Sequence, residues 1–297
     1  MAFDIEKYKA RSTKLDLSDI EWDGVARYPL PQGAIDAMYY MMDIETHTVI
    51  YLSELLVSKA CMDPVITSFL SIWVYEEMYH GEAFSQFLRC YGLEVSEERP
   101  RQVRLSEGFH RVSSVMAVLF GSYLAPFFPA IYLTIGAVNE MTTLTGYQQL
   151  SKHAGHPILT QILERIIKQE RVHFAFYRSH AERLLESSAL ARSAVRHVMQ
   201  RRFRAVGEGV KTAAEVDALA MFLFDGPDGR QATQRIDAAA QALPGLEGVN
   251  LLERLLDRAE RRFAAAPGPA RFATQEHLAS DARTPAADRS IGSSPRG

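Results

Sequence analysis

Along much of this chain, apolar residues recur every three or four positions, whereas the strict alternation typical of β-strands is scarce. Four of these helical stretches are long enough to form a bundle, and we expect them to cover residues 33–59, 64–91, 126–155 and 157–186. Prolines lie near the start of three of these stretches, and glycines, Gly92 and Gly155, lie at the ends of two, as is usual at helix termini. The pattern therefore predicts an all-α fold with four long helices.

Shorter elements are expected around these four helices. Residues 93–104 are rich in Glu and Arg and predict a polar loop, and a helix over about 105–123 follows. After residue 186 we expect three or four short helices, broken at Gly207, Gly226–Gly229 and Pro244–Gly245. The chain is thus predicted to comprise an N-terminal segment (1–32), a bundle (33–186), a helical extension (187–265) and a disordered tail (266–297).

One stretch, residues 112–139, contains no charged residue and is long enough to suggest a membrane span. Two prolines and two glycines interrupt it, and Glu140 follows it directly. A helix in the centre of a bundle is likewise apolar on all sides. We therefore interpret the stretch as a buried helix and expect no transmembrane segment.

Composition narrows the interpretation further. The 297 residues are 47% hydrophobic, which is enough for one main domain with a large core. The net charge of −3 gives no indication of nucleic-acid binding. Two cysteines form no evident disulfide framework, and residues 1–9 lack the apolar core of a signal peptide. We expect a cytoplasmic protein.

Two Glu-x-x-His motifs, Glu77–His80 and Glu170–His173, lie within predicted long helices, and Glu45 and Glu140 lie on the helices before them. Residues three apart share one helix face, so each motif offers an oxygen and a nitrogen ligand together. Four helices that each supply a carboxylate, two of them adding an imidazole, form the ligand set of a carboxylate-bridged di-iron centre. A third match, Glu107–His110, is interrupted by glycine, and we expect it to be fortuitous.

The ligand types also restrict the metal. Carboxylates with one imidazole per metal suit iron and manganese, and the absence of thiolates argues against zinc or iron–sulfur sites. We expect two Fe ions, with a Mn/Fe pair as the alternative. Such a centre activates O2, which would be the co-substrate.

The neighbouring residues carry a resemblance to a known family. Residues 73–81, Trp-Val-Tyr-Glu-Glu-Met-Tyr-His-Gly, are similar to the W-x-x-E-E-x-x-H-G segment of soluble acyl-acyl-carrier-protein desaturases. Asn139–Thr143, Lys152–Gly155 and Gln169–His173 resemble the third and fourth helices of that family in order and spacing. The resemblance spans about residues 35–186, and the wider relatives are ferritin-like di-iron oxidases.

This resemblance implies a ferritin-like four-helix bundle with additional helices, acting as a homodimer. It implies dehydrogenation of an acyl chain carried by acyl carrier protein, with electrons from a donor such as ferredoxin. A di-iron hydroxylase or N-oxygenase of a small metabolite is the alternative among enzymes. An iron-binding or ferroxidase protein without an organic substrate is the alternative outside that class.

The resemblance also implies roles for the ligands. Glu77 and Glu170 would bridge or span the two metals. Glu45 and His80 would bind one metal, and Glu140 and His173 the other.

Three further positions correspond to functional residues of the family. Thr143 corresponds to a threonine beside the O2 site, where its hydroxyl could relay a proton, although Thr142 and Thr143 could equally bond to a backbone carbonyl one turn back. Glu76 and Gln169 correspond to residues that accept the outer N–H of a ligand histidine. Desaturases have Asp at the position of Gln169, so the family's electron route is in doubt here.

Other departures argue against neighbouring families. Phe84 occupies the position of the radical tyrosine of the ribonucleotide reductase small subunit, and Ile166 that of an extra histidine ligand of N-oxygenases. Four apolar or small residues one turn from the ligands could line a dry substrate cavity or simply belong to the core. They are Met41, Trp73, Gly136 and Ile166.

A basic cluster follows the fourth long helix and includes Arg192, Arg196, Arg201 and Arg202. It is interpreted either as a solvated helix face or as a docking patch for an acidic partner such as acyl carrier protein.

Overall fold

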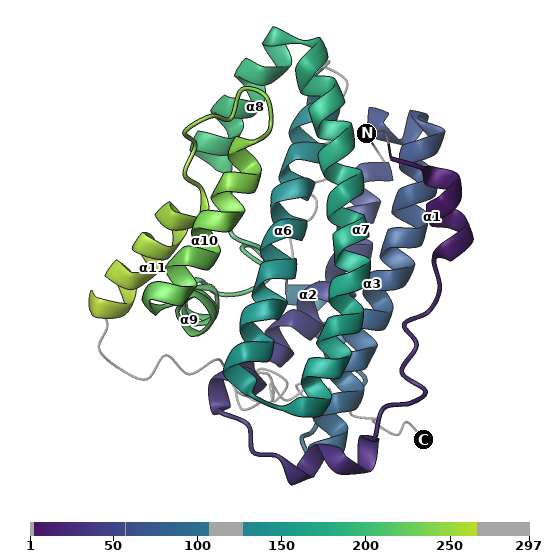
Figure 1. Cartoon of the computed structure of the whole chain (residues 1–297), viewed down its shortest axis with the longest axis vertical. Coiled ribbons are helices and arrows are strands. Elements are labelled where there is room, and N and C mark those ends of the chain that lie inside the picture. Colours follow the sequence, from purple (N-terminus) through teal and green to yellow (C-terminus); the bar gives the residue numbers. More distant parts are fainter. Residues whose placement is uncertain (1–2, 57, 107–126, 266–297) are drawn as a thin grey trace, which may run out of the picture.

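The computed structural model describes residues 3–56, 58–106 and 127–265, and within them it is helical with no β-strand (Figure 1). The predicted all-α fold is confirmed. Four long helices pack as a bundle, in which α2 contacts α3, α3 contacts α7, α7 contacts α6, and α6 contacts α2. Their bounds are Gln32–Leu56 for α2, Pro64–Cys90 for α3, Phe128–Ala154 for α6 and Pro157–Ser187 for α7.

Local residues explain where these helices begin and end. The Asp63 side chain accepts hydrogen bonds from the first backbone amides of α3, and Pro64 fills its first turn. Gly155 ends α6 in the left-handed conformation at φ 58°, which glycine adopts without strain. Two residues later, Pro157 begins α7. The four predicted ranges therefore agree with the structure to within a few residues.

One predicted loop is wrong in part. Residues 99–104, expected within the loop 93–104, belong to helix α4 (Arg99–Ser106). The guanidinium of Arg99 donates to both carboxylate oxygens of Asp43 on α2, at 2.7 and 2.8 Å, and both side chains are buried. This buried ion pair anchors a segment whose charged composition alone indicates a solvated loop.

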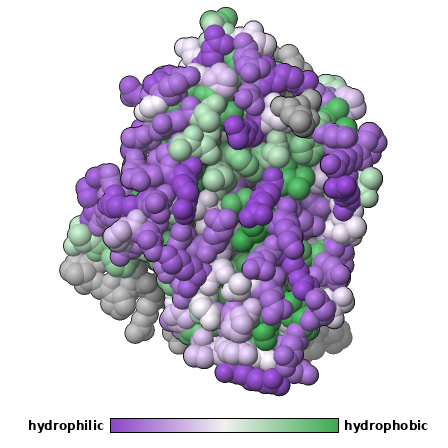
Figure 2. Space-filling model, in the orientation of Figure 1, coloured by the Kyte–Doolittle hydropathy of each residue, from purple (hydrophilic) through white to green (hydrophobic). Residues whose placement is uncertain are grey.

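Several predictions fall on residues outside the described ranges. They are the helix at 105–123 beyond Ser106, the third motif Glu107–His110 and the tail 266–297. No helix of the described residues is long and apolar enough to cross a membrane. The face of the molecule in Figure 2 is largely hydrophilic, with hydrophobic side chains confined to smaller areas between the polar ones.

The helical extension packs against one side of the bundle (Figure 1). It comprises α8 (Ala189–Arg202), α9 (Ala213–Phe224), α10 (Gly226–Gln241) and α11 (Leu252–Ala265). The break expected at Gly226–Gly229 lies one residue earlier, at Asp225, which is the N-cap of α10 and separates it from α9; residues 226–229 form the first turn of α10.

The N-terminal segment lies on the opposite side of the bundle (Figure 1). It contains α1 (Ile5–Arg11) and a short 3-10 helix, Trp22–Arg27, and a second 3-10 helix, Lys59–Met62, connects α2 to α3. The division of the chain into four parts stays a prediction.

Candidate metal centre

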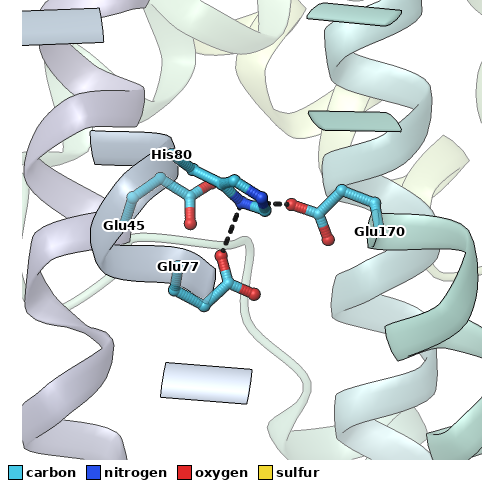
Figure 3. Close-up of side chains that lie close together, drawn as sticks. All are labelled: Glu45, Glu77, His80 and Glu170. Atoms are coloured by element: carbon cyan, nitrogen blue, oxygen red, sulfur yellow. Dashed lines mark hydrogen bonds and ion pairs between the residues drawn. The ribbon is translucent and has the colours of Figure 1, made fainter. Parts of the chain in front are cut away.

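Six acidic and histidine side chains, one or two from each bundle helix, meet in the interior. In one group, the candidate ligand atoms of Glu45, Glu77, His80 and Glu170 all lie within 4.8 Å of one another, and Figure 3 shows Glu170 facing the other three. A second group, with the same limit on distances, consists of Glu77, Glu140, Glu170 and His173. All six residues are buried. Each group could hold a metal ion, and Glu77 and Glu170 belong to both.

Glu77 and Glu170 each present one oxygen to each histidine. His80 Nδ1 lies 3.1 Å from Glu77 Oε2 and 3.3 Å from Glu170 Oε1. His173 Nδ1 lies 3.1 Å from Glu77 Oε1 and 3.3 Å from Glu170 Oε2. This is the placement that two carboxylates need in order to bridge a pair of metal ions.

The outer nitrogens of both imidazoles bond to the residues expected from the sequence. Nε2 of His80 lies 2.8 Å from Gln169 Oε1, and Nε2 of His173 lies 2.7 Å from Glu76 Oε2. Both partners accept a hydrogen bond, so each Nε2 carries a proton and each Nδ1 faces the carboxylates. A lone pair at Nδ1 would be repelled by those oxygens unless a cation lay between them.

Two of the carboxyl groups resist ionisation. Burial raises the pKa of Glu45 well above its usual range, and the Glu77 carboxylate raises it further. Burial and the Glu170 carboxylate raise the pKa of Glu140 in the same way. Burial also opposes ionisation of Glu77 and Glu170, but hydrogen bonds, notably from the two histidines, outweigh it and lower both pKa values.

For the two imidazoles, burial lowers the pKa, whereas hydrogen bonds to the carboxylates raise it by a larger amount. The net effect raises the pKa of His80 to about 10 and that of His173 well above its usual range. These shifts favour protons on both imidazoles and on Glu45 and Glu140, and four such protons would offset the four negative charges of the carboxylates. Two divalent metal ions would bring the same four positive charges.

The donor set fits such a metal pair. Oxygen and imidazole ligands without thiolates suit iron or manganese. Oε1 of Glu170 is buried, and apart from its contact with His80 Nδ1 at 3.3 Å it has no hydrogen-bond partner among the described residues, so it could bind a cation. The site residues therefore carry the chemistry of a di-metal centre.

Comparison with known proteins agrees with this chemistry. The model of a family described as fatty acid desaturases matches residues 48–222, more than half of the chain. The chain belongs to this fatty acid desaturase family. Neither the curated proteins nor the solved structures gave a significant match. The predicted resemblance to desaturases is thus confirmed for the family of fatty acid desaturases. Membership of this family makes the protein an oxidoreductase. The matched residues include every expected ligand except Glu45.

Further side chains that support the desaturase site escaped the sequence analysis. The hydroxyl of Tyr147 donates to the Glu45 carboxylate, and Nε1 of Trp73 donates to Glu140 Oε1 at 3.0 Å. Trp73 was expected as an apolar cavity residue, so its polar role was missed. Each bond joins residues more than sixty positions apart, and no local pattern indicates such a pair.

A cavity of about 1090 Å³, partly open to solvent, borders the candidate ligands. The four candidate ligand carboxylates line it, as do Trp73, Gly136 and Thr143. A second cavity, also partly open to solvent, has walls from α2, α6 and the C-terminal helices, and Met41 is among its lining residues. Thr143 and Glu45 line both, so the two spaces meet beside the centre. Ile166 is fully buried and lines neither.

The two threonines of the desaturase motif behave differently. The Thr142 hydroxyl donates to the Val138 carbonyl at 2.7 Å, which is the bond to a backbone carbonyl one turn back that was considered above. For Thr143, the hydroxyl has no hydrogen-bond partner within the described part of the chain. It is therefore available to a bound molecule.

The basic cluster divides into two kinds of arginine. Arg192 donates to the Leu185 carbonyl at 2.7 Å, and Arg196 donates to the Gly245 and Glu247 carbonyls at 2.9 Å each. The hydrogen bonds of these two side chains therefore stabilise the fold. Arg201 and Arg202 are exposed, and Arg202 lines the larger cavity.

Proposed function

We propose that this protein is a non-haem di-iron, O2-dependent desaturase that introduces a double bond into an acyl chain attached to acyl carrier protein. The observation that carries the proposal is the pair of metal-capable groups sharing Glu77 and Glu170 beside an apolar cavity. The reaction removes two hydrogen atoms from neighbouring carbons. Together with two further electrons and two protons, these reduce O2 to two molecules of water. Iron, when bound, would supply the O2 chemistry.

The side chains have distinct tasks in this proposal. Glu45 and His80 would hold one metal, Glu140 and His173 would hold the other, and Glu77 and Glu170 could serve both. The Tyr147 hydroxyl and the Trp73 indole fix the orientation of the two terminal carboxylates, Glu45 and Glu140. Thr143 Oγ1 is placed to hold or pass a proton at the edge of the centre.

The apolar cavity suits a hydrocarbon chain. Apart from Glu45 and three threonines, the residues that line it are apolar or aromatic, and they offer a hydrocarbon chain favourable contacts beside the centre. The cavity favours an organic substrate over a ferroxidase function. The family match favours desaturation over hydroxylation or N-oxidation.

The partners follow from the same proposal. Docking of an acidic carrier would rest on Arg201 and Arg202, since Arg192 and Arg196 bond to backbone carbonyls. A donor such as ferredoxin would supply the two electrons. Homodimer formation and a cytoplasmic location stay predictions.

The test combines metal analysis with product analysis. Protein loaded with iron under anaerobic conditions should contain about two Fe per chain, and Glu77→Ala and Glu170→Ala should abolish that binding. With O2, a ferredoxin and acyl carrier protein bearing saturated chains, mass spectrometry should show products lighter by two hydrogens. Products heavier by one oxygen would indicate hydroxylation, and absence of bound iron would contradict the proposal altogether.

A further inference from the structure

The N-terminal segment reaches the outer partners of both candidate ligand histidines. Residues 3–19, here called the N-terminal strap, run along the outside of α3 and α7 (Figure 1). The Tyr8 hydroxyl donates to Glu76 Oε2 at 2.7 Å, and the Gln169 amide donates to the Thr13 carbonyl at 3.1 Å. Glu76 and Gln169 are the two residues that bond His173 and His80.

Tyr8 holds Glu76 in one orientation. The same oxygen, Oε2, accepts from Tyr8 and from His173 Nε2, each at 2.7 Å, and all three side chains are buried. The ring of Phe3 packs edge-on against Phe176, with 5.1 Å between centroids, and so ties the strap to α7. Rotation of the carboxylate away from His173 would break both hydrogen bonds, so Tyr8 opposes it.

The Thr13 carbonyl acts on a glutamine that has two possible orientations. A flipped Gln169 would present its NH2 group to His80 Nε2, which could then carry no proton. The imidazole proton would move to Nδ1, the atom that faces the carboxylates, and would block a metal there. Because the amide donates to Thr13, its oxygen faces His80 and Nδ1 stays available.

We propose that the strap is a positioning element of the metal centre, in which Tyr8 and the Thr13 carbonyl fix both ligand histidines through Glu76 and Gln169. This proposal rests on the di-metal site of the proposed function, and it adds that the two metal positions differ in affinity. His173 is backed by a carboxylate and His80 by a neutral amide, so the His173 imidazole is the stronger donor. Divalent metal should therefore bind in two separable steps.

The test uses the full chain and Co(II), followed by calorimetry and by visible absorption of the metal. Tyr8→Phe removes the bond to Glu76 and leaves the ring packing. Tyr91→Phe is the matched control, because its hydroxyl also bonds the N-terminal segment, accepting from Leu30 N at 3.0 Å, but contacts no candidate ligand. Tyr8→Phe should weaken one Co(II) step about tenfold, whereas Tyr91→Phe should leave both steps as in the unmodified protein.

Glu76→Gln tests the inequality, because it gives both histidines an amide partner, and the two Co(II) steps should then converge. Equal Co(II) binding by Tyr8→Phe, Tyr91→Phe and unmodified protein would overturn the positioning role. If the two Co(II) binding steps stay separate in Glu76→Gln, the partners Glu76 and Gln169 are not the cause of the difference in affinity. Failure of the unmodified protein to bind Co(II) would instead count against the di-metal site itself.

Discussion

At the scale of single residues, charge balance dominates the centre. Four carboxylates cannot all be ionised in a buried space unless cations accompany them. In the metal-free protein, the raised pKa values of the imidazoles and of Glu45 and Glu140 favour protons in this role. Metal ions must displace those protons, so metal affinity and protein stability are linked to pH at this site.

The first prediction concerns that linkage. The folded-state pKa of His80 is raised from 6.5 to about 10, so its stabilising contribution is complete below pH 6.5 and is lost as pH rises towards 10. A metal-bound imidazole has no such loss. The increase in Tm caused by Co(II) should therefore grow between pH 6.5 and about 8.5, as measured by calorimetry. A metal-induced increase that stays constant over this range would contradict the assigned charges.

The second prediction separates two adjacent threonines. Thr143→Val removes the hydroxyl that faces both cavities and should lower desaturation about tenfold without changing the metal content. Thr142→Val is the matched control: Thr142 also lines the apolar cavity but not the larger one, and its hydroxyl is already bonded to the carbonyl of its own helix, so turnover should change little. Product formation and bound iron would be measured on the same samples. Equal losses of turnover in the two variants would argue for a purely structural role.

At the scale of helices, close approach of α6 and α7 beside the centre depends on glycine. A Cβ atom on Gly136 would lie 2.4 Å from the ring of Tyr177, which is buried, so the ring would have to shift to accept it. At Gly146 of the same helix, the nearest atom, Leu223 Cδ1, would lie at 3.6 Å. Packing thus requires a glycine at position 136 of α6 but not at position 146 of the same helix.

The third prediction follows from this pair. Gly136→Ala should destabilise the protein by about 1–3 kcal/mol, because the added methyl group overlaps the tyrosine ring. Gly146→Ala should stabilise it by about 0.5–1 kcal/mol, because alanine loses less conformational freedom in a helix. Urea unfolding of both variants would measure the two effects. A neutral Gly136→Ala would show that α6 and α7 are less closely packed than the structure indicates.

The same scale shows what the sequence could predict. The long helices follow from apolar periodicity and from residues such as Pro64 and Gly155, which act within one turn. The six candidate ligands could be predicted because two helices repeat one motif. Tyr8 and Tyr147 act across the fold, and nothing near them in sequence marks their partners. Helix α4 was mistaken for a loop because its anchor, Asp43, lies 56 residues away.

At the scale of the whole molecule, the C-terminal extension encloses space that the bundle alone would leave open. Side chains of α9, α10 and α11 form the wall of the apolar cavity opposite Met41 and Thr143. An acyl chain entering beside the centre would therefore extend towards these helices. The size of that space should limit how much of the chain lies beyond the oxidised carbons.

The last prediction tests this limit. Ala220 lies on α9 and lines the cavity, so Ala220→Phe should occupy part of its volume and shift the preference towards shorter acyl chains by several-fold. Ala214→Phe on the same helix is the matched control, since Ala214 is exposed and lines neither cavity beside the centre. Competition between carrier-bound chains of two lengths, with both products quantified by mass spectrometry, gives the ratio directly. Iron content should be equal in both variants, because neither residue contacts the ligands. If the ratio of products is the same in Ala220→Phe, Ala214→Phe and the unmodified protein, the chain does not lie between α9 and the centre, and the extension serves stability alone.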